Sequence, residues 1–543
     1  MSKPFAITLD TGSSLVNLTG SWRSKRPVFA DHMPPCNIAC PAGENIQQWL
    51  YHAEEGNYHL AWQEIMKHNP LPAIMGRACY HTCEGECNRA KLDETVGIHA
   101  VERFLGDLAI DNNWRVKITV PRSGKKVMVI GSGPGGLSAA YHLTLLGHAV
   151  TLFEAAPKAG GLMRYGIPRY RLPRKVLNAE VDRIERMGVE FKLNTPVRDI
   201  VGVMEDEGFD VVFAAIGAQL PRQIDIPTDD SVHMYDAIHM LRSIELEEEF
   251  PDIGDKVVIY GGGNVAVDAA RSAVRLGAKE VSIVYRRSRD KMPAHSFEIK
   301  EAVEEGVELN CLRVVRKVEN GNIQVEQMVL TDTNKPFPTG QMENIKADTL
   351  ILALGQLVDA DCCLSSVPGV GVLQGNVQVD KAMCTGNEKI FAGGDLVPCE
   401  RTITVAVGHG KKAAHYIDAY LRETEYQPKP KSPTATYEKL NTWYFSDAPK
   451  TVQPILNLIR RQSGFEEVLG NLDEDNALFE ARRCLSCGNC FECDNCYGAC
   501  PDNAIDKLGS GKRFKVNYDY CKGCGLCATE CPCGAIDIVN ETI

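Results

Sequence analysis

Residues 127–136, Val-Met-Val-Ile-Gly-Ser-Gly-Pro-Gly-Gly, decide the fold of this 543-residue chain. A short apolar run leads into a glycine-rich turn and then into a helix-forming stretch over residues 137–146. A second apolar run, residues 149–153, ends at Glu154. This is the G-x-G-x-x-G fingerprint in the strand–turn–helix context that dinucleotide binding requires.

Each residue of this turn has an expected role. Gly131 permits the tight turn, Gly133 lets the backbone approach a pyrophosphate, and Gly136 allows close packing of helix on strand. The phosphates are expected at the helix N-terminus beside Pro134, and Glu154 is expected to accept a hydrogen bond from a ribose hydroxyl. The pattern therefore predicts a dinucleotide site.

The same pattern recurs about 130 residues later in the chain. Residues 256–260 form a predicted strand, followed by Gly-Gly-Gly-Asn-Val-Ala over residues 261–266 and a helix over residues 267–276. The residues expected to contact the second nucleotide are Gly261, Gly263, Asn264 and Ala266. The next strand, residues 281–285, ends in Arg286 and Arg287 instead of an acid, which favours the 2′-phosphate of NADP(H) over NAD(H). The alternative is that both arginines are solvated surface residues.

Later segments indicate that one dinucleotide domain is inserted into the other. Residues 210–217 and 349–355 read as strands that end at Gly217 and Gly355, as at two crossovers. Residues 390–395, Ile-Phe-Ala-Gly-Gly-Asp, are expected to present Gly394 and Asp395 to a ribityl or pyrophosphate group. An FAD domain split by an NAD(P)H domain implies hydride exchange between the cofactors, for which no catalytic acid–base pair is needed.

The cysteines near the C-terminus have ferredoxin spacing. Two runs of Cys-x2-Cys-x2-Cys-x3-Cys-Pro follow one another, at residues 490–501 and 521–532. In two-cluster ferredoxins the fourth cysteine of each run binds the other cluster. One [4Fe–4S] cluster is therefore predicted on Cys490, Cys493, Cys496 and Cys531, and a second on Cys521, Cys524, Cys527 and Cys500. Cys533 is expected to be a non-ligand, and zinc ribbons would not require the third cysteine.

Composition limits the remaining classes. The formal net charge is −12 and no long basic run occurs, which argues against nucleic-acid and membrane partners. No run approaches the roughly 18 apolar residues of a membrane span, and no signal peptide is evident, so a cytoplasmic location is expected. A reducing compartment argues against disulfides among the 21 cysteines. Five scattered cysteines are read as buried hydrophobes: Cys311, Cys362, Cys363, Cys384 and Cys399.

Roughly residues 30–425 resemble the family that includes the small subunit of NADPH-dependent glutamate synthase. They are also similar to the flavin half of dihydropyrimidine dehydrogenase and to the large subunit of NADPH:ferredoxin transhydrogenase. The resemblance rests on Cys36-x3-Cys40-Pro, on residues 76–87 with Cys79, Cys83 and Cys87, on Gly-Gly-Leu-Met-Arg-Tyr-Gly-Ile-Pro over residues 160–168, and on the second glycine-rich turn with Arg286-Arg287. It implies that Gly161 and Leu162 also belong to the FAD site.

The family implies two further [4Fe–4S] clusters in an N-terminal helical domain. One would take Cys40, Cys79 and Cys83, with Glu102 as its fourth ligand, although a solvated helix-face glutamate is the simpler alternative. The other would take Cys36 and Cys87, but the Arg-Cys-x2-Cys pair that relatives carry upstream is missing. A matching string, Arg483-Cys484-x2-Cys487, lies just before the ferredoxin run. We hypothesise that Cys484 and Cys487 complete this cluster, within the chain or from a partner subunit.

The predicted fold class is multidomain α/β. The expected segments are a helical [4Fe–4S] domain (1–120), an FAD domain in two parts (121–235 and 376–425), an inserted NAD(P)H domain (236–375), a linker (426–480) and an α+β ferredoxin-like domain (481–543). Residues 427–433 read as a stiff, solvated connector. Residues 19–23 are interpreted as an arm that covers a neighbour.

The leading functional hypothesis is an NAD(P)H:acceptor oxidoreductase with FAD and four [4Fe–4S] clusters. Its appended ferredoxin domain would connect the flavin to a catalytic redox subunit, such as a 2-oxoacid oxidoreductase or sulfite reductase, or to ferredoxin. A glutamate synthase small subunit and a free-standing NADPH:ferredoxin oxidoreductase are the alternatives. A flavin disulfide reductase would need a Cys-x-x-Cys or Cys-x4-Cys beside the flavin, and a non-catalytic iron–sulfur module would not need two nucleotide folds. Both a homodimer and a hetero-oligomer stay open, as does the direction of electron flow.

Overall fold

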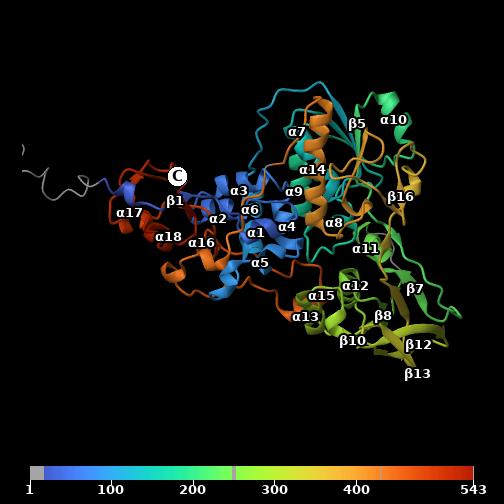
Figure 1. Ribbon diagram of the computed structural model, residues 1–543. Coiled ribbons are helices and arrows are strands. Elements are labelled where there is room, and N and C mark those ends of the chain that lie inside the picture. Colours follow the sequence, from blue (N-terminus) through green and yellow to red (C-terminus); the bar gives the residue numbers. More distant parts are fainter. Residues whose placement is uncertain (1–17, 247–251, 429, 542–543) are drawn as a thin grey trace, which may run out of the picture.

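The computed structural model describes residues 18–246, 252–428 and 430–541. Its units form a row (Figure 1), with the ferredoxin-like unit at one end, the helical domain in the middle and the two dinucleotide domains together at the other end. The predicted fold class is confirmed. In the described part of the chain, no helix is long and apolar enough to cross a membrane.

The first fingerprint opens a five-stranded parallel sheet with strand order β18–β5–β2–β3–β4. The strands are β2 (Lys126–Ile130), β3 (Ala149–Phe153), β4 (Glu190–Lys192), β5 (Val211–Ala214) and β18 (Ile390–Ala392). Helix α7 (Pro134–Leu145) follows the glycine-rich turn and packs against α14 (Ile403–Leu421), as Figure 1 shows. Shorter elements complete this domain: α8 (Leu162–Tyr165), α9 (Arg174–Glu185), α10 (Ile200–Glu207), β16 (Val372–Leu373) and β17 (Asn376–Val377). Because β18 pairs with β5 across the inserted domain, the FAD-type domain is split as expected.

The inserted domain has a second parallel sheet with strand order β10–β9–β8–β14–β7. Its strands are β7 (His233–Asp236), β8 (Lys256–Tyr260), β9 (Glu280–Tyr285), β10 (Glu308–Cys311) and β14 (Thr349–Leu352). One face packs on α11 (Ala237–Leu246), α12 (Asn264–Arg275) and α13 (Ser296–Glu304). The other packs on an antiparallel sheet of β11 (Arg313–Glu319), β12 (Asn322–Leu330) and β13 (Pro336–Lys346). The two crossovers pair as β6 (Leu220–Pro221) and β15 (Gln356–Leu357).

The helical domain shares its core with the FAD-type domain. Its helices are α1 (Pro35–Ala39), α2 (Ile46–Glu54), α3 (Tyr58–Met66), α4 (Pro72–Ala78), α5 (Thr82–Gly85) and α6 (Ile98–Asp111). Trp62, Leu71 and Ile74 are fully buried in one cluster with the strands of the first sheet. This continuous core fixes the helical domain against the flavin domain.

The ferredoxin-like unit includes residues that the sequence assigns elsewhere. Its elements are α17 (Asn495–Ala499), α18 (Leu526–Thr529), β19 (Ile505–Lys507), β20 (Phe514–Val516) and β21 (Ile536–Asn540). Strand β1 (Lys25–Phe29) pairs antiparallel with β21, so residues 25–29 are a strand of this unit and not part of the helical domain. The sequence does not show this, because the partner that makes them a strand lies about 500 residues away. Before it, residues 19–22 lie on residues 518–521 of the same chain, where Gly20 N donates to Asp519 O at 2.9 Å.

Three assigned boundaries are corrected by the structure. The inserted domain begins before residue 236, because β7 starts at His233 and pairs with β14 of the second sheet. The assigned linker, residues 426–480, is not loose over most of its length: the 442–483 segment, with α15 (Leu458–Ser463) and α16 (Glu474–Arg482), contacts the helical, flavin and nucleotide domains. The ion pairs that hold residues 442–483 are made with residues far away in the sequence, so no local sequence pattern predicts that this segment is ordered. Residues 358–375, assigned to the nucleotide domain, contribute Leu364 and Val367 to the flavin-domain core.

Candidate functional site

A cavity of 540 Å³ lies where the flavin, nucleotide and helical domains meet. The glycine-rich turn forms one wall, and Gly131 has a φ of 96° that favours glycine. A Cβ at Gly131 would stand 2.4 Å from Ala215 O, whereas nothing lies within 4 Å of a Cβ at Gly133. The turn is therefore packed on the protein side and open on the cavity side, which fits a dinucleotide pyrophosphate.

The other predicted flavin residues surround the same cavity. Pro134, Glu154, Gly161, Leu162, Gly217, Gly394 and Asp395 all line it. Gly136 lies behind the wall, where a Cβ would collide with Gly131 O at 1.9 Å. Glu154 Oε2 accepts from Ser132 N at 2.9 Å, which holds the carboxylate at the end of β3. Burial raises the pKa of Asp395.

The second fingerprint approaches this cavity from the nucleotide domain. Asn264 lines the cavity at the start of α12, and Gly263 is the residue before that helix. A Cβ at Gly261 would stand 2.2 Å from Ala353 O, so this turn is also closely packed. Ala266 is fully buried and packs in the domain core. Gly355, with a φ of 99°, follows β14 at the second crossover.

Arg286 and Arg287 lie beyond the cavity lining, at the end of β9. Arg286 is exposed, and its charge acts on the Tyr260 hydroxyl. Arg287 is half-buried, and its Nε is enclosed without a hydrogen-bond partner. An unpaired guanidinium nitrogen next to an exposed arginine fits a phosphate ligand.

Cys40, Cys79 and Cys83 converge beside the flavin cavity, and we name this set with Glu102 the flavin-side site. Burial raises the pKa of each of these three thiols, and the Cys40 and Cys79 charges raise that of Cys83 further. Cys79 Sγ accepts from Thr404 Oγ1 on α14 at 3.2 Å. Its neighbours in the sequence, Ala78 and Tyr80, line the cavity. The site therefore adjoins the flavin domain directly.

Glu102 is a buried carboxylate of the flavin-side site, not a solvated one, because its side chain lies in the domain interior. Burial, Glu44 and Cys79 raise its pKa well above the ordinary value. The Asn69 amide donates to Glu102 at 2.8 Å and to Glu44 at 2.9 Å, so it bridges the two carboxylates. Glu44, which the sequence reasoning missed, is thus a second acid here.

Cys36, Cys87, Cys484 and Cys487 line one small cavity of a single chain, and we name them the split site. Enclosure of the Cys36 thiol raises its pKa well above the ordinary value, and the other three thiols raise it further. Four mutually repelling thiolates at one point need a cationic centre, which fits an iron–sulfur cluster. The structure therefore brings the relocated pair together with the N-terminal pair in cis.

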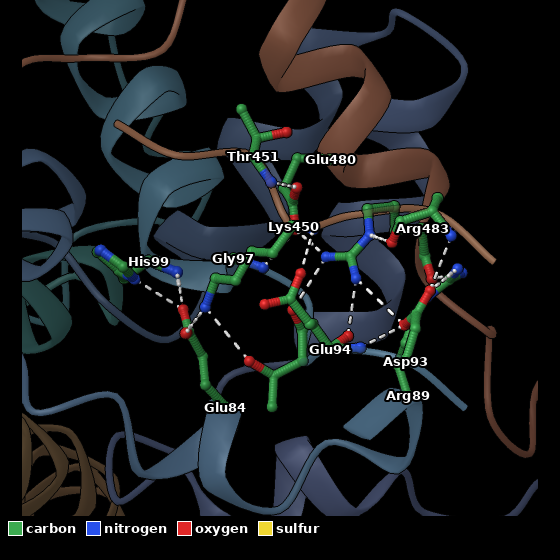
Figure 2. A network of polar contacts seen from close by, with 12 residues as sticks. Glu84, Arg89, Asp93, Glu94, Gly97, His99, Lys450, Thr451, Glu480 and Arg483 are labelled. Carbon is green, nitrogen blue, oxygen red and sulfur yellow. Dashed lines mark hydrogen bonds and ion pairs between the residues drawn. The ribbon is translucent and has the colours of Figure 1, made fainter. Parts of the chain in front are cut away.

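A buried polar network holds the relocated pair in place (Figure 2). Glu480 accepts from Gly97 N and from Arg483 Nη1, both at 2.6 Å, and from Thr451 N at 2.8 Å. Arg483 also donates to Glu94 O at 2.8 Å, and its own carbonyl accepts from Arg89 at 2.7 Å. Because Arg483 immediately precedes Cys484, these bonds fix the start of the Cys484–Cys487 loop.

Glu84 and His99, which Figure 2 also labels, belong to a second group that resembles a metal site. With His81 they offer ligand atoms within 4.8 Å of one another. Their geometry does not fit a metal, because the two rings stack at 3.7 Å and their in-plane lone pairs run parallel. Lys450 Nζ lies 2.6 Å from Glu84 Oε2 and already supplies a cation. Burial favours the neutral acid, but hydrogen bonding by His99 and the Lys450 charge hold the pKa of Glu84 below its ordinary value.

The ferredoxin cysteines form two groups with crossed fourth members. Cys500, Cys521, Cys524 and Cys527 line one small cavity, the outer ferredoxin site. Cys490, Cys493, Cys496 and Cys531 interact electrostatically and form the inner ferredoxin site. Cys533 Sγ lies 3.7 Å from Cys531 Sγ, and that contact lowers the pKa of Cys531 to about 6. Cys493 and Cys524 are exposed.

Several scattered cysteines depart from the prediction. Only Cys363 of the five is buried; Cys362 is exposed and lines the flavin cavity, while the other three are half-buried. Cys362 ends a three-residue 3-10 helix (Ala360–Cys362) just after the second crossover, which is too short for a periodic pattern to indicate burial. The sequence also gives no signal for Tyr80 and Arg171, two single polar residues that line the cavity.

Comparison with known families defines the class of protein. The pyridine nucleotide-disulphide oxidoreductase model matches residues 125–410, more than half of the chain. The model of dihydropyrimidine dehydrogenase domain II with its 4Fe-4S cluster matches residues 24–114, and the 4Fe-4S dicluster domain model matches residues 489–535. The chain belongs to the pyridine nucleotide-disulphide oxidoreductase family and carries iron–sulfur domains on both sides of the family's fold.

Sequence similarity to individual curated relatives defines the class of this chain more narrowly. The chain is 34% identical over 502 residues to the NADP(+)-dependent formate dehydrogenase subunit beta of Moorella thermoacetica, covering 83% of this chain and 70% of the relative. It is 30% identical over 507 residues to the NADPH-Fe(3+) oxidoreductase subunit beta of Geobacter sulfurreducens, covering 83% and 75%. It is 33% identical over 423 residues to the glutamate synthase [NADPH] small chain of Escherichia coli K12, covering 72% and 89%. The resemblance is confirmed: this chain is an NAD(P)H-dependent flavin and iron–sulfur oxidoreductase.

Proposed function

We propose that the chain is an electron-transfer subunit that connects NADPH, through FAD and four [4Fe–4S] clusters, to a separate redox partner. The observation that carries the proposal is the unbroken series of cysteine sites between the flavin cavity and the exposed cysteines of the ferredoxin-like unit. When bound, FAD exchanges two-electron equivalents with NADPH and single electrons with clusters. The chain's own residues bind, orient and enclose these groups.

The residues of the flavin cavity hold the two nucleotides in complementary ways. Gly131, Gly133 and the N-terminus of α7 would hold the FAD pyrophosphate, with Glu154 at a ribose. Asn264 and the N-terminus of α12 would hold the second nucleotide. Arg286 and Arg287 would select NADPH over NADH, because only NADPH has a 2′-phosphate for them to bind.

The four cluster sites follow one another along short covalent segments. The flavin-side and split sites are linked by α1: Cys36 lies in this helix and Cys40 directly follows it, four residues later, about 6 Å along a helix. The split and inner ferredoxin sites are linked by Gly488 and Asn489, the two residues between Cys487 and Cys490. The inner and outer sites are linked by α17, between Cys496 and Cys500. We propose this order as the route, which electrons can take in either direction.

The partner would dock near the ferredoxin-like unit, since the route ends there. Relatives named as beta subunits support a hetero-oligomeric complex, with a catalytic redox subunit as the other component. The split site needs no ligand from a second copy of the chain, because one chain supplies all four of its thiols. We propose a cytoplasmic location from the reduced cysteines.

Anaerobic affinity purification from native cells tests this function. We expect the tagged chain to co-purify with a stoichiometric catalytic subunit, whose own cofactor would identify the physiological reaction. A chain that purifies alone but reduces ferredoxin with NADPH would be the free-standing NADPH:ferredoxin oxidoreductase. A chain that purifies alone and reduces neither ferredoxin nor a one-electron dye with NADPH would contradict the proposal.

A further inference from the structure

Arg171 joins the flavin domain to the nucleotide domain beside the cavity. It lies in the loop between α8 and α9, and its Nη1 donates to both carboxylate oxygens of Asp268, at 2.9 and 2.7 Å. Its Nη2 forms an ion pair with Glu298, without the alignment of a hydrogen bond. The Arg171 side chain is only 12% exposed, and those of Asp268 and Glu298 are 6% and 1% exposed. The contact is therefore a desolvated bridge between domains.

The position of Asp268 makes this bridge relevant to the reaction. Asp268 lies on α12, one turn after Asn264, and both residues line the cavity. Four residues correspond to about 6 Å along a helix. A movement of Asp268 away from Arg171 would therefore carry the N-terminus of α12, and the nucleotide that it binds, away from the flavin wall.

The loop of Arg171 is itself held firmly. The adjacent Tyr170 is fully buried, its ring 3.9 Å from the guanidinium of Arg275 on α12. The Tyr170 carbonyl accepts a hydrogen bond from Val468 N at 2.9 Å, so the 442–483 segment also holds the Arg171 loop in place. The same segment reaches the nucleotide domain, where Arg461 Nε donates to Glu305 at 3.0 Å.

The helical domain makes a contact with the same end of α12. Asn264 Nδ2 donates to the Tyr80 hydroxyl, and the Tyr80 ring stacks on His295 at a centroid distance of 3.8 Å. Tyr80 follows Cys79, a residue of the flavin-side site. Contacts from the flavin domain, the 442–483 segment and the helical domain thus converge on α12 and its neighbour α13.

We propose that Arg171 is a positioning residue that holds the nucleotide domain against the flavin cavity in the orientation that hydride transfer requires. The inference rests on the proposed function of the cavity and identifies a residue outside both glycine-rich turns. Arg171 need not touch the reacting atoms: it acts through Asp268 and α12. Its removal should slow transfer more than it weakens nucleotide binding, because the phosphate contacts are all within the nucleotide domain.

The test compares purified holoprotein carrying Arg171→Ala, Asp268→Asn or both changes with the unchanged chain. Arg186→Ala is the matched control, because Arg186 is an exposed arginine on the surface just after α9. Flavin bleaching is followed by anaerobic stopped flow with NADPH and, separately, with dithionite, which does not need the nucleotide domain. FAD and iron contents are measured for each variant.

We expect each single variant to slow NADPH-driven bleaching by about 10²-fold, since a misplacement near 1 Å can cost that much. The NADPH concentration at half-maximal rate and the dithionite rate should stay within a factor of about two, and the double variant should be no slower than the slower single variant. Wild-type rates in either single variant, multiplied effects in the double variant, or loss of FAD from both single variants would overturn the inference. If NADPH fails to bleach even the unchanged chain, the proposed function fails instead.

Discussion

Replacing Cys484 and Cys487 together with serine removes two of the four thiols of the split site and none from the other sites. A [4Fe–4S] cluster needs four protein ligands, so we expect this cluster alone to be lost. Iron should fall from about 16 to about 12 atoms per chain, with FAD unchanged. Cys384→Ser is the matched control, because Cys384 is half-buried in the flavin domain outside every cysteine group, and it should retain the full iron content.

The assay is anaerobic reconstitution followed by iron, acid-labile sulfide and FAD analysis on the same sample. EPR should then show that NADPH no longer reduces the ferredoxin clusters, although it still bleaches the flavin, because the missing cluster lies between them. Co-expressing this variant with a Cys36→Ser, Cys87→Ser variant should not restore the iron of the split site, since the structure places all four thiols of that site in one chain. Full iron content in the double variant would refute the assignment, and restoration by co-expression would refute its cis arrangement.

Three further predictions concern the NADPH phosphate, the Glu102 ligand and the buried Glu305. The Arg286→Ala, Arg287→Ala double variant should raise the KM for NADPH by about 10- to 100-fold and leave the KM for NADH nearly unchanged, since lost charge-assisted hydrogen bonds cost about 1.5–3 kcal/mol; equal losses would contradict the 2′-phosphate site. Glu102→Ala should alter the EPR signal of the flavin-side cluster, whereas Glu44→Ala should not; an unaltered Glu102→Ala spectrum would exclude Glu102 as a ligand. Glu305→Ala leaves three arginines without their shared acid and should destabilise the nucleotide domain by about 3–5 kcal/mol. Burial opposes ionisation of Glu305, yet hydrogen bonds from two of these arginines lower its pKa from 4.5 to about 2. Because the pKa of Glu305 is lower in the folded state, its stabilisation is present above pH 4.5 and is lost as the pH falls toward 2. Urea unfolding of the unchanged chain and the Glu305→Ala variant at pH 7 and pH 3 measures the destabilisation and its pH dependence. Equal destabilisation by the substitution at pH 7 and at pH 3 would contradict this role of Glu305.

The parts of the fold that the sequence predicts well are those with a local physical cause. Both glycine-rich turns lie between an apolar strand and a helix, so their fold follows from contiguous residues such as Gly131 and Gly261. The ferredoxin spacing is equally local, and it carries the crossed position of Cys500 with it. The split site was predictable for a different reason: a known pair was missing from one place and present at another.

The remaining features depend on contacts between distant segments. Strand β1 exists only because β21 offers it an edge, and residues 442–483 are ordered by ion pairs such as that of Arg461 with Glu305. Tyr80 and Arg171 are single polar residues in otherwise ordinary stretches, and only the folded chain shows that both reach α12. The local periodicity of the sequence does not predict these contacts, because they form between segments that only tertiary packing brings together.

In the proposed route, one chain carries electrons from NADPH through the flavin cavity and all four cysteine sites. An anaerobic titration of the reconstituted holoprotein with NADPH, followed by visible absorbance and EPR on the same samples, tests it most directly. We expect bleaching of the flavin together with EPR signals from reduced clusters, including those of the ferredoxin-like unit. The signals of the ferredoxin-like unit should be lost when the split site is removed. Flavin bleaching by NADPH with every cluster left oxidised, in a sample where dithionite reduces them all, would contradict it.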